Sequence, residues 1–119
     1  MSIFGQVLIV EDDPSIRQTL QSLLELEGVA SVSASNGHDA LELLRVNPAP
    51  RVILLDMNMP VMDGREFLNR MRQENLAPHA PVVVLTASQI SLVAQGVCRW
   101  FTKPVDFDVL LEAIQQVAS

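Results

Sequence analysis

Short strand-like segments alternate along the chain with segments whose apolar residues recur every three or four positions. The strand-like segments lie at residues 6–10, 29–35, 52–56, 81–86 and 100–102, and the periodic segments at residues 14–27, 37–46, 64–74, 88–95 and from 107 onward. Recurrence every three or four positions predicts an amphipathic helix, whereas a continuous apolar run predicts a strand buried on both faces. This alternation indicates a parallel sheet with right-handed crossovers and helices on both faces.

Capping residues at the segment boundaries support these helices. Asp13, Asp63 and Asp106 each stand where an N-cap is expected, and Gly28 stands where the first helix should end. The apolar residues of the first helix are expected to lie on one face of it, and they are Ile16, Leu20, Leu23 and Leu24.

The expected fold is α/β, a flavodoxin-like (βα)5 domain with a doubly wound parallel sheet and the strand order 2-1-3-4-5. In that order the first and third strands are neighbours, and the carboxyl ends of all the strands lie at one edge. The fourth helix, residues 88–95, is expected to be shortened or irregular, because it offers at most about two turns. Its apolar residues Ile90, Leu92 and Val93 form no continuous stripe.

The composition is that of a folded domain of ordinary size. With 119 residues, of which 49% are hydrophobic and 18% charged, residues 1–119 are predicted to form a single domain. A net charge of -6 argues against a nucleic-acid surface on this domain. The single cysteine allows no internal disulfide, and neither a leader nor a membrane-spanning run is recognisable. We therefore expect a cytoplasmic protein that binds no membrane.

Polar residues follow four of the predicted strands at the point where each strand ends. Glu11 and Asp12 follow the first strand, Asp56 ends the third, Thr86 ends the fourth, and Lys103 follows the fifth. Three crowded carboxylates repel one another unless a cation or protons intervene. Because oxygen ligands favour a hard ion, the sequence predicts a Mg²⁺ site at this edge of the sheet.

The same edge carries groups suited to a phosphoryl group. A hydroxyl donor at Thr86 and a compact positive charge at Lys103 match phosphoryl oxygens, and Asp56 can attack phosphorus to give an aspartyl phosphate. Lys103 is the only lysine among eight basic residues, which indicates that this position requires a point charge. Each residue alone has a simpler explanation, as Asp13 does in capping a helix, but their combination at four strand ends favours this chemistry.

Four motifs carry a resemblance to a known family. They are Val-Glu-Asp-Asp at residues 10–13, Leu-Leu-Asp-Met-Asn-Met-Pro-Val-Met-Asp-Gly at 54–64, Leu-Thr-Ala at 85–87 and Trp-Phe-Thr-Lys-Pro at 100–104. Together they resemble the response regulator receiver domain over residues 7–118. The resemblance implies a two-component phosphorelay in which a histidine kinase or phosphotransfer protein gives a phosphoryl group to Asp56, which switches an output domain or effector protein. It also implies a signalling phosphoacceptor that promotes its own phosphorylation and dephosphorylation, rather than an enzyme.

The resemblance also assigns a role to each ligand of the metal. Asp12 would bind Mg²⁺ directly together with Asp56, and Glu11 would act through water. Asn58 occupies the position whose backbone carbonyl completes the metal site in the family.

Around the phosphoryl group, Thr86 and Lys103 match the family's phosphate-sensing hydroxyl and ion-pairing lysine, Trp100 matches the switch aromatic, and Pro104 is expected to follow a cis bond. Thr86 and Lys103 are 17 positions apart, which is shorter than the family's spacing by about one and a half helical turns. The missing length falls in the fourth helix, part of the face that most receivers use to signal. We therefore expect a different output surface, or a role as a phosphoryl relay or sink.

Three rival interpretations use similar residues. A phosphatase of the haloacid dehalogenase type would need an aspartate at the position of Asn58, and a flavin-binding domain would not place Glu11 and Asp12 against a phosphate. A receiver-like interaction domain that signals without phosphorylation stays open, although every residue of the acceptor site is present.

Overall fold

This computed structural model describes residues 7–57, 62–86, 97–103 and 105–118. Within these ranges the elements are, in chain order, β1 (Val7–Val10), α1 (Pro14–Leu26), β2 (Ser31–Ala34), α2 (Gly37–Val46), β3 (Val52–Asp56), α3 (Gly64–Gln73), β4 (Val82–Thr86), β5 (Val97–Thr102) and α4 (Phe107–Ala118). The strands form one parallel sheet in the order β2-β1-β3-β4-β5. The predicted flavodoxin-like topology is confirmed.

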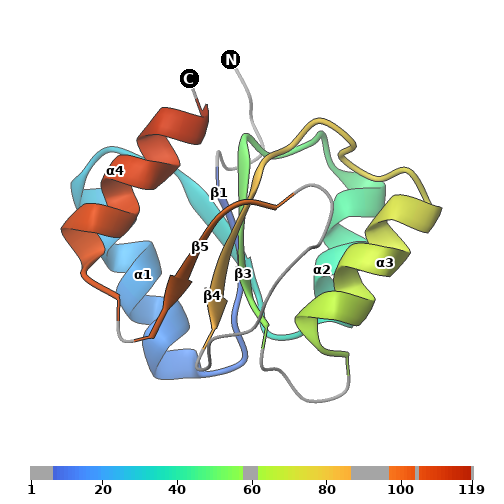
Figure 1. Cartoon of the computed structure of the whole chain (residues 1–119), viewed down its shortest axis with the longest axis horizontal. Coiled ribbons are helices and arrows are strands. Elements are labelled where there is room, and N and C mark those ends of the chain that lie inside the picture. Colours follow the sequence, from blue (N-terminus) through green and yellow to red (C-terminus); the bar gives the residue numbers. More distant parts are fainter. Residues whose placement is uncertain (1–6, 58–61, 87–96, 104, 119) are drawn as a thin grey trace.

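Helices cover both faces of the sheet, with α1 and α4 on one face and α2 and α3 on the other (Figure 1). Successive strand residues point to opposite faces, so each strand contributes to two separate cores. The strand residues beneath α1 and α4 are Val7, Ile9, Val52, Leu54, Val83 and Leu85. Those beneath α2 and α3 are Leu8, Val10, Ala34, Ile53, Leu55, Val82 and Val84. Burial on both faces explains why β1, β3 and β4 consist almost entirely of branched apolar residues.

The helices begin and end where the sequence predicts. The Asp13 carboxylate caps α1 by accepting a hydrogen bond of 2.8 Å from the backbone N–H of Ser15. Asp63 caps α3 and Asp106 caps α4 in the same way. After α1 the chain reverses through Gly28, whose φ of 76° lies in the left-handed region that favours glycine. These caps fix where each helix leaves the edge of the sheet.

The fifth strand begins earlier than the predicted start at Trp100. It starts at Val97, which pairs with Val82 of β4, and a register shift follows between Val82 and Val83. As an edge strand, β5 exposes the side chains of Arg99 and Trp100, so it has no continuous apolar run to mark it. The parallel pairing with β4 therefore decides its length.

Ile16, Leu20 and Leu23 line one groove and so share a face of α1 as predicted, but the residues of that face differ in burial. Leu20 and Leu24 are buried as expected, whereas Ile16 is 37% exposed. Ile16 lines an open groove between α1 and the start of α4, beside Val105 and Phe107. Because α4 does not close over this first turn of α1, the side chain stays accessible to solvent.

Three expectations fall outside the described residues: the irregular fourth helix at residues 88–95, the backbone carbonyl of Asn58 and the cis bond before Pro104. Across the described part of the chain, no helix combines the length and the apolar character needed to cross a membrane.

Candidate functional site

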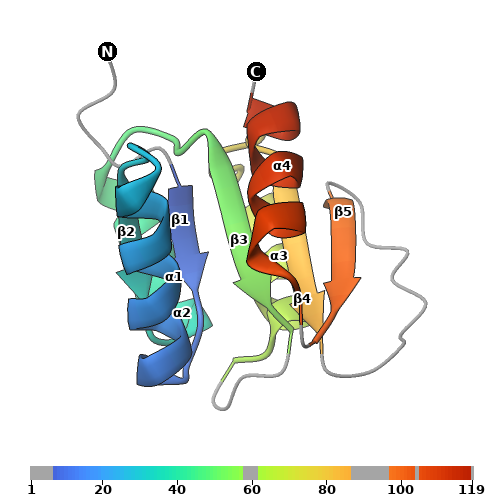
Figure 2. The same ribbon diagram turned by 90° about the vertical axis from the view of Figure 1, so that its left-hand side faces the viewer.

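The parallel strands bring the predicted polar residues to one edge of the sheet. Figure 2 shows β1, β3, β4 and β5 pointing in the same direction, so their carboxyl ends lie together. Glu11 and Asp12 follow β1, Asp56 ends β3, Thr86 ends β4, and Lys103 follows β5. Glu11 and Lys103, which are 92 positions apart in the chain, thereby come into contact.

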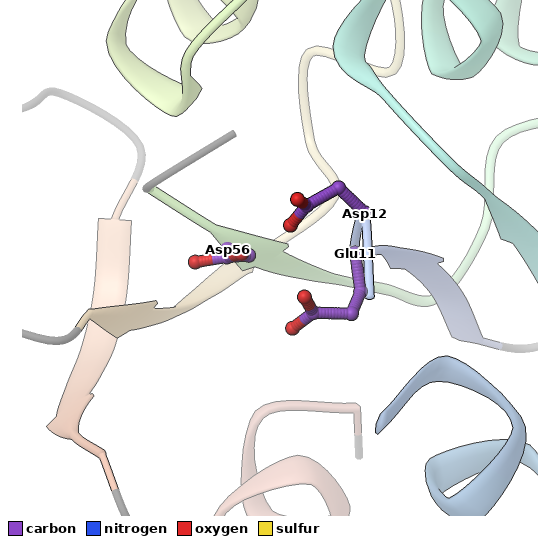
Figure 3. Close-up of side chains that lie close together, drawn as sticks. All are labelled: Glu11, Asp12 and Asp56. Carbon is purple, nitrogen blue, oxygen red and sulfur yellow. The ribbon is translucent and has the colours of Figure 1, made fainter. Parts of the chain in front are cut away.

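Three carboxylates converge at the ends of β1 and β3 (Figure 3). One oxygen from each of Glu11, Asp12 and Asp56 lies within 4.8 Å of the others. Glu11 and Asp56 are each only 2% exposed, whereas Asp12 is half-buried. Two acids are therefore withdrawn from water beside a third that solvent still reaches, which is an unfavourable arrangement unless positive charge compensates it.

Lys103 supplies part of that positive charge. Its Nζ lies 3.2 Å from Oδ1 of Asp56 and 3.4 Å from Oε1 of Glu11. Burial opposes the charge of the ammonium group, but the carboxylates of Asp56 and Glu11 outweigh burial and raise the pKa of Lys103 above its ordinary value. Lys103 is therefore charged at neutral pH and bridges the acids that follow β1 and β3.

The surroundings of Glu11 raise the pKa of its carboxyl group. The pKa of its carboxyl group is raised from 4.5 to about 7, chiefly by burial and also by the neighbouring Asp56, while the backbone N–H of Asp13 and the ammonium of Lys103 act in the opposite direction. The N–H of Asp13 donates to Oε2 of Glu11 at 3.2 Å. In the metal-free protein the carboxyl group of Glu11 therefore titrates close to neutral pH.

The donor set fits a hard divalent cation. All three acidic side chains offer oxygen, and Asp12 remains accessible from solvent. Mg²⁺ is commonly held by one or two carboxylates and keeps several waters, which suits a site with one accessible acid. A cation here would also relieve the repulsion that raises the pKa of Glu11.

The backbone holds both acidic strand ends in place. The N–H of Glu11 donates to the carbonyl of Ala34 in β2 at 3.1 Å, and the N–H of Met57, directly after Asp56, donates to the carbonyl of Leu85 at 3.0 Å. Gly64 begins α3 so close to this loop that a Cβ there would lie 2.8 Å from the Cα of Met57. A glycine is thus required where α3 packs against the loop after Asp56.

Sequence reasoning missed two of these contributions. Asp13 was expected only to cap α1, yet its N–H also holds the carboxylate of Glu11. The packing requirement at Gly64 has no local sequence signal, because it depends on a loop and a helix meeting in space. Trp100 pairs with Val84 across the sheet and is 47% exposed, and its role as a switch stays a prediction. Thr86 ends β4 as predicted, while its side chain lies outside the described part of the structure.

A model of the response regulator receiver domain matches residues 7–115 of the chain. The chain belongs to this family. Receiver domains are the phosphoacceptor modules of two-component signalling, and the resemblance seen in the four motifs is therefore confirmed.

Relatives of this receiver domain differ in length. Sporulation initiation phosphotransferase F of Bacillus subtilis is 33% identical over 118 residues, a match that covers 93% of this chain and 91% of that protein. The DNA-binding transcriptional regulator NtrC of Escherichia coli is 33% identical over 120 residues, but the match covers 97% of this chain and only 25% of NtrC. Among solved structures, TrrA of Thermotoga maritima in complex with Mg²⁺-BeF is 27% identical with a TM-score of 0.82, and the match covers 96% of this chain and 99% of TrrA.

Proposed function

We propose that this receiver domain accepts a phosphoryl group on Asp56 from the phosphohistidine of a histidine kinase or a phosphotransfer protein. The observation that carries the proposal is the environment of Asp56, a buried carboxylate at the centre of the acid cluster whose Oδ1 lies 3.2 Å from the ammonium of Lys103. A carboxylate in this position can act as a nucleophile, and the ammonium group of Lys103 beside it can stabilise the negative charge of a phosphoryl group.

Glu11, Asp12 and Asp56 would hold Mg²⁺, with the backbone carbonyl of Asn58 as a further ligand. The arrangement of the three acids supports this choice, and the related TrrA was solved in complex with Mg²⁺-BeF. When bound, the metal supplies charge neutralisation for the phosphoryl oxygens and a fixed template for their orientation.

In the transfer, an oxygen of the Asp56 carboxylate uses a lone pair to form a bond to phosphorus. The bond between phosphorus and the imidazole nitrogen of the donor histidine breaks, and its electron pair remains on that nitrogen. Lys103 then pairs with a phosphoryl oxygen in place of the carboxylate, and the Thr86 hydroxyl donates to another oxygen. These new contacts at the ends of β4 and β5 would carry the signal to an output domain or effector protein.

The wider context is part of the same proposal. Residues 1–119 would act as one cytoplasmic receiver unit that binds neither nucleic acid nor membrane by itself. It would be a signalling phosphoacceptor that promotes its own phosphorylation and dephosphorylation, rather than an enzyme with a separate substrate.

A second candidate, onward transfer of the phosphoryl group to a histidine of another protein, is favoured by one comparison. The match to sporulation initiation phosphotransferase F extends over nearly the whole of that protein. Phosphorylated domain mixed with candidate histidine phosphotransfer proteins would lose its added mass while the partner gains it. Loss of the mass by hydrolysis alone, with every such partner left unmodified, would argue against the relay.

Phosphorylation of Asp56 is tested by incubating the protein with a small phosphodonor and Mg²⁺, followed by intact mass spectrometry. The parent should gain one phosphoryl group, and Asp56→Asn or removal of Mg²⁺ by a chelator should abolish the gain. Asp108→Asn, a change at an exposed aspartate in the first turn of α4, is the matched control and should behave as the parent. A gain that persists in Asp56→Asn would refute the acceptor, and no gain in the parent would favour an interaction domain that signals without phosphorylation.

A further inference from the structure

A basic side chain with no part in the proposed phosphoryl chemistry contacts the loop of residues 11–13, which connects β1 to α1. Arg17 stands near the start of α1 and is half-buried. Its Nη1 donates a hydrogen bond of 2.9 Å to the carbonyl oxygen of Glu11 and one of 3.4 Å to the carbonyl oxygen of Asp12. The two carbonyls belong to the successive peptide groups on either side of the Asp12 Cα, so one guanidinium holds both peptide planes.

We propose that Arg17 is a positioning residue that fixes the backbone around Asp12 and thereby directs the Asp12 carboxylate toward the cation of this site. The inference rests on the proposed Mg²⁺-dependent function and extends it to a residue outside the ligand set. Arg17 contacts the loop through carbonyl oxygens, and its role would be carried out through Asp12 rather than at the phosphoryl group.

The need for such a residue follows from how differently the two neighbouring acids are held. The Glu11 carboxylate is fixed by the N–H of Asp13 and by Lys103. Within the described part of the chain, the Asp12 carboxylate makes no hydrogen bond or ion pair. Its direction therefore depends on the backbone, which leaves β1 after Val10 and enters α1 only at Pro14. Arg17 anchors this connection from the helix side, as the Ala34 carbonyl anchors the N–H of Glu11 from the sheet side.

Charge and geometry predict opposite effects of Arg17 on cation binding. A guanidinium next to a cation site repels the cation, so loss of its charge alone should tighten Mg²⁺ binding. If Arg17 instead orients the ligand, its loss should weaken binding, because groups that orient metal ligands commonly account for about 10-fold to 100-fold in affinity. The sign of the change therefore separates the two roles.

The experiment compares Mg²⁺ affinity by isothermal titration calorimetry in the parent, Arg17→Met and Arg17→Lys. Arg70→Met is the matched control, because it removes the same charge from an exposed position on α3, where Arg70 pairs with Glu66. The rate of phosphorylation by a small phosphodonor is measured in each protein as a function of Mg²⁺ concentration. If Arg17→Met is too unstable for calorimetry without metal, the dependence of its free energy of unfolding on Mg²⁺ concentration gives the affinity by linkage.

Arg17→Met should bind Mg²⁺ about ten-fold more weakly than the parent, and Arg17→Lys, which keeps a charged donor, should recover part of the loss. The maximal phosphorylation rate of Arg17→Met should return toward that of the parent at saturating Mg²⁺, because the acceptor and Lys103 are intact. An affinity equal to or tighter than the parent's in Arg17→Met would overturn the inference, as would a loss of the same size in Arg70→Met. A parent protein that binds no Mg²⁺ would instead overturn the proposed function itself.

Discussion

Glu11 couples the stability of the metal-free protein to pH, because its carboxyl group is buried beside a second acid. Burial and the neighbouring Asp56 raise the pKa of Glu11 from 4.5 to about 7 in the folded protein, whereas the unfolded chain keeps an ordinary value. The folded state then binds the proton more tightly than the unfolded state between these two values. The free energy of unfolding must therefore fall as the pH rises from about 4.5 to 7, and it stays lower above that range.

The size of the effect follows from the change in pKa. A rise from 4.5 to about 7, converted at about 1.4 kcal/mol per pH unit, corresponds to about 3 kcal/mol of stability. Glu11→Gln keeps the shape of the side chain and removes its titration, so the variant should lose this part of the pH dependence. Relative to Glu11→Gln, the parent should become less stable by about 3 kcal/mol between pH 4.5 and pH 8.

Urea unfolding followed by far-ultraviolet circular dichroism, with a chelator present, measures the effect at each pH. Glu25→Gln, at an exposed position on α1, is the control and should run parallel to the parent at every pH. With saturating Mg²⁺ the penalty above pH 7 should disappear, because a bound cation replaces the proton as the compensating charge. Parallel curves for the parent and Glu11→Gln from pH 4.5 to 8 without metal would refute the reasoning.

Two further predictions concern the groups around Asp56. Lys103→Met should still bind Mg²⁺ but slow phosphorylation by on the order of 100-fold, measured as the initial rate of mass gain, and a rate equal to the parent's would exclude Lys103 from stabilising the transfer. Gly64→Ala should reduce the free energy of unfolding by about 1 to 3 kcal/mol, because the new Cβ would lie 2.8 Å from the backbone of Met57. Gly37→Ala, whose Cβ would have side-chain atoms of Met62 and Phe67 as its nearest neighbours, is the comparison in urea unfolding, and an equal loss in the two variants would contradict the argument.

The fold could be predicted from the sequence because its central strands are buried on both faces. Parallel strands covered by helices on either side typically show runs such as Val-Ile-Leu-Leu at residues 52–55, and each of these runs is followed by or ends at a polar residue. The alternation with helices indicated a doubly wound sheet, and the order 2-1-3-4-5 favoured for such a sheet brings together the acids at the ends of β1 and β3. The meeting of the three acids at one edge is therefore a consequence of topology and could be predicted from the sequence.

Features that depend on pairing or packing between distant elements were not predictable in the same way. The start of β5 at Val97 is set by hydrogen bonding to β4, and the exposed Arg99 and Trp100 conceal it. Ile16 follows the spacing of the inner face of α1, yet it lies where α4 leaves a groove open. Periodicity identifies the side of a helix that faces inward, but the neighbouring elements decide how far along the helix that side is covered.

Arg17 and Lys103 are two basic residues that contact the acids or the backbone at this edge of the sheet, and they suit different tasks. Lys103 contacts two carboxylates and, in the proposed function, would also pair with a phosphoryl oxygen, so a compact ammonium on a flexible stem matches its position. Arg17 contacts two carbonyls of one loop through a single nitrogen, Nη1, which the planar guanidinium holds in a fixed position. In the proposed function, the single lysine of the chain therefore stands where its ammonium must move from a carboxylate to a phosphoryl oxygen. Arg17 stands where two backbone carbonyls must keep their positions.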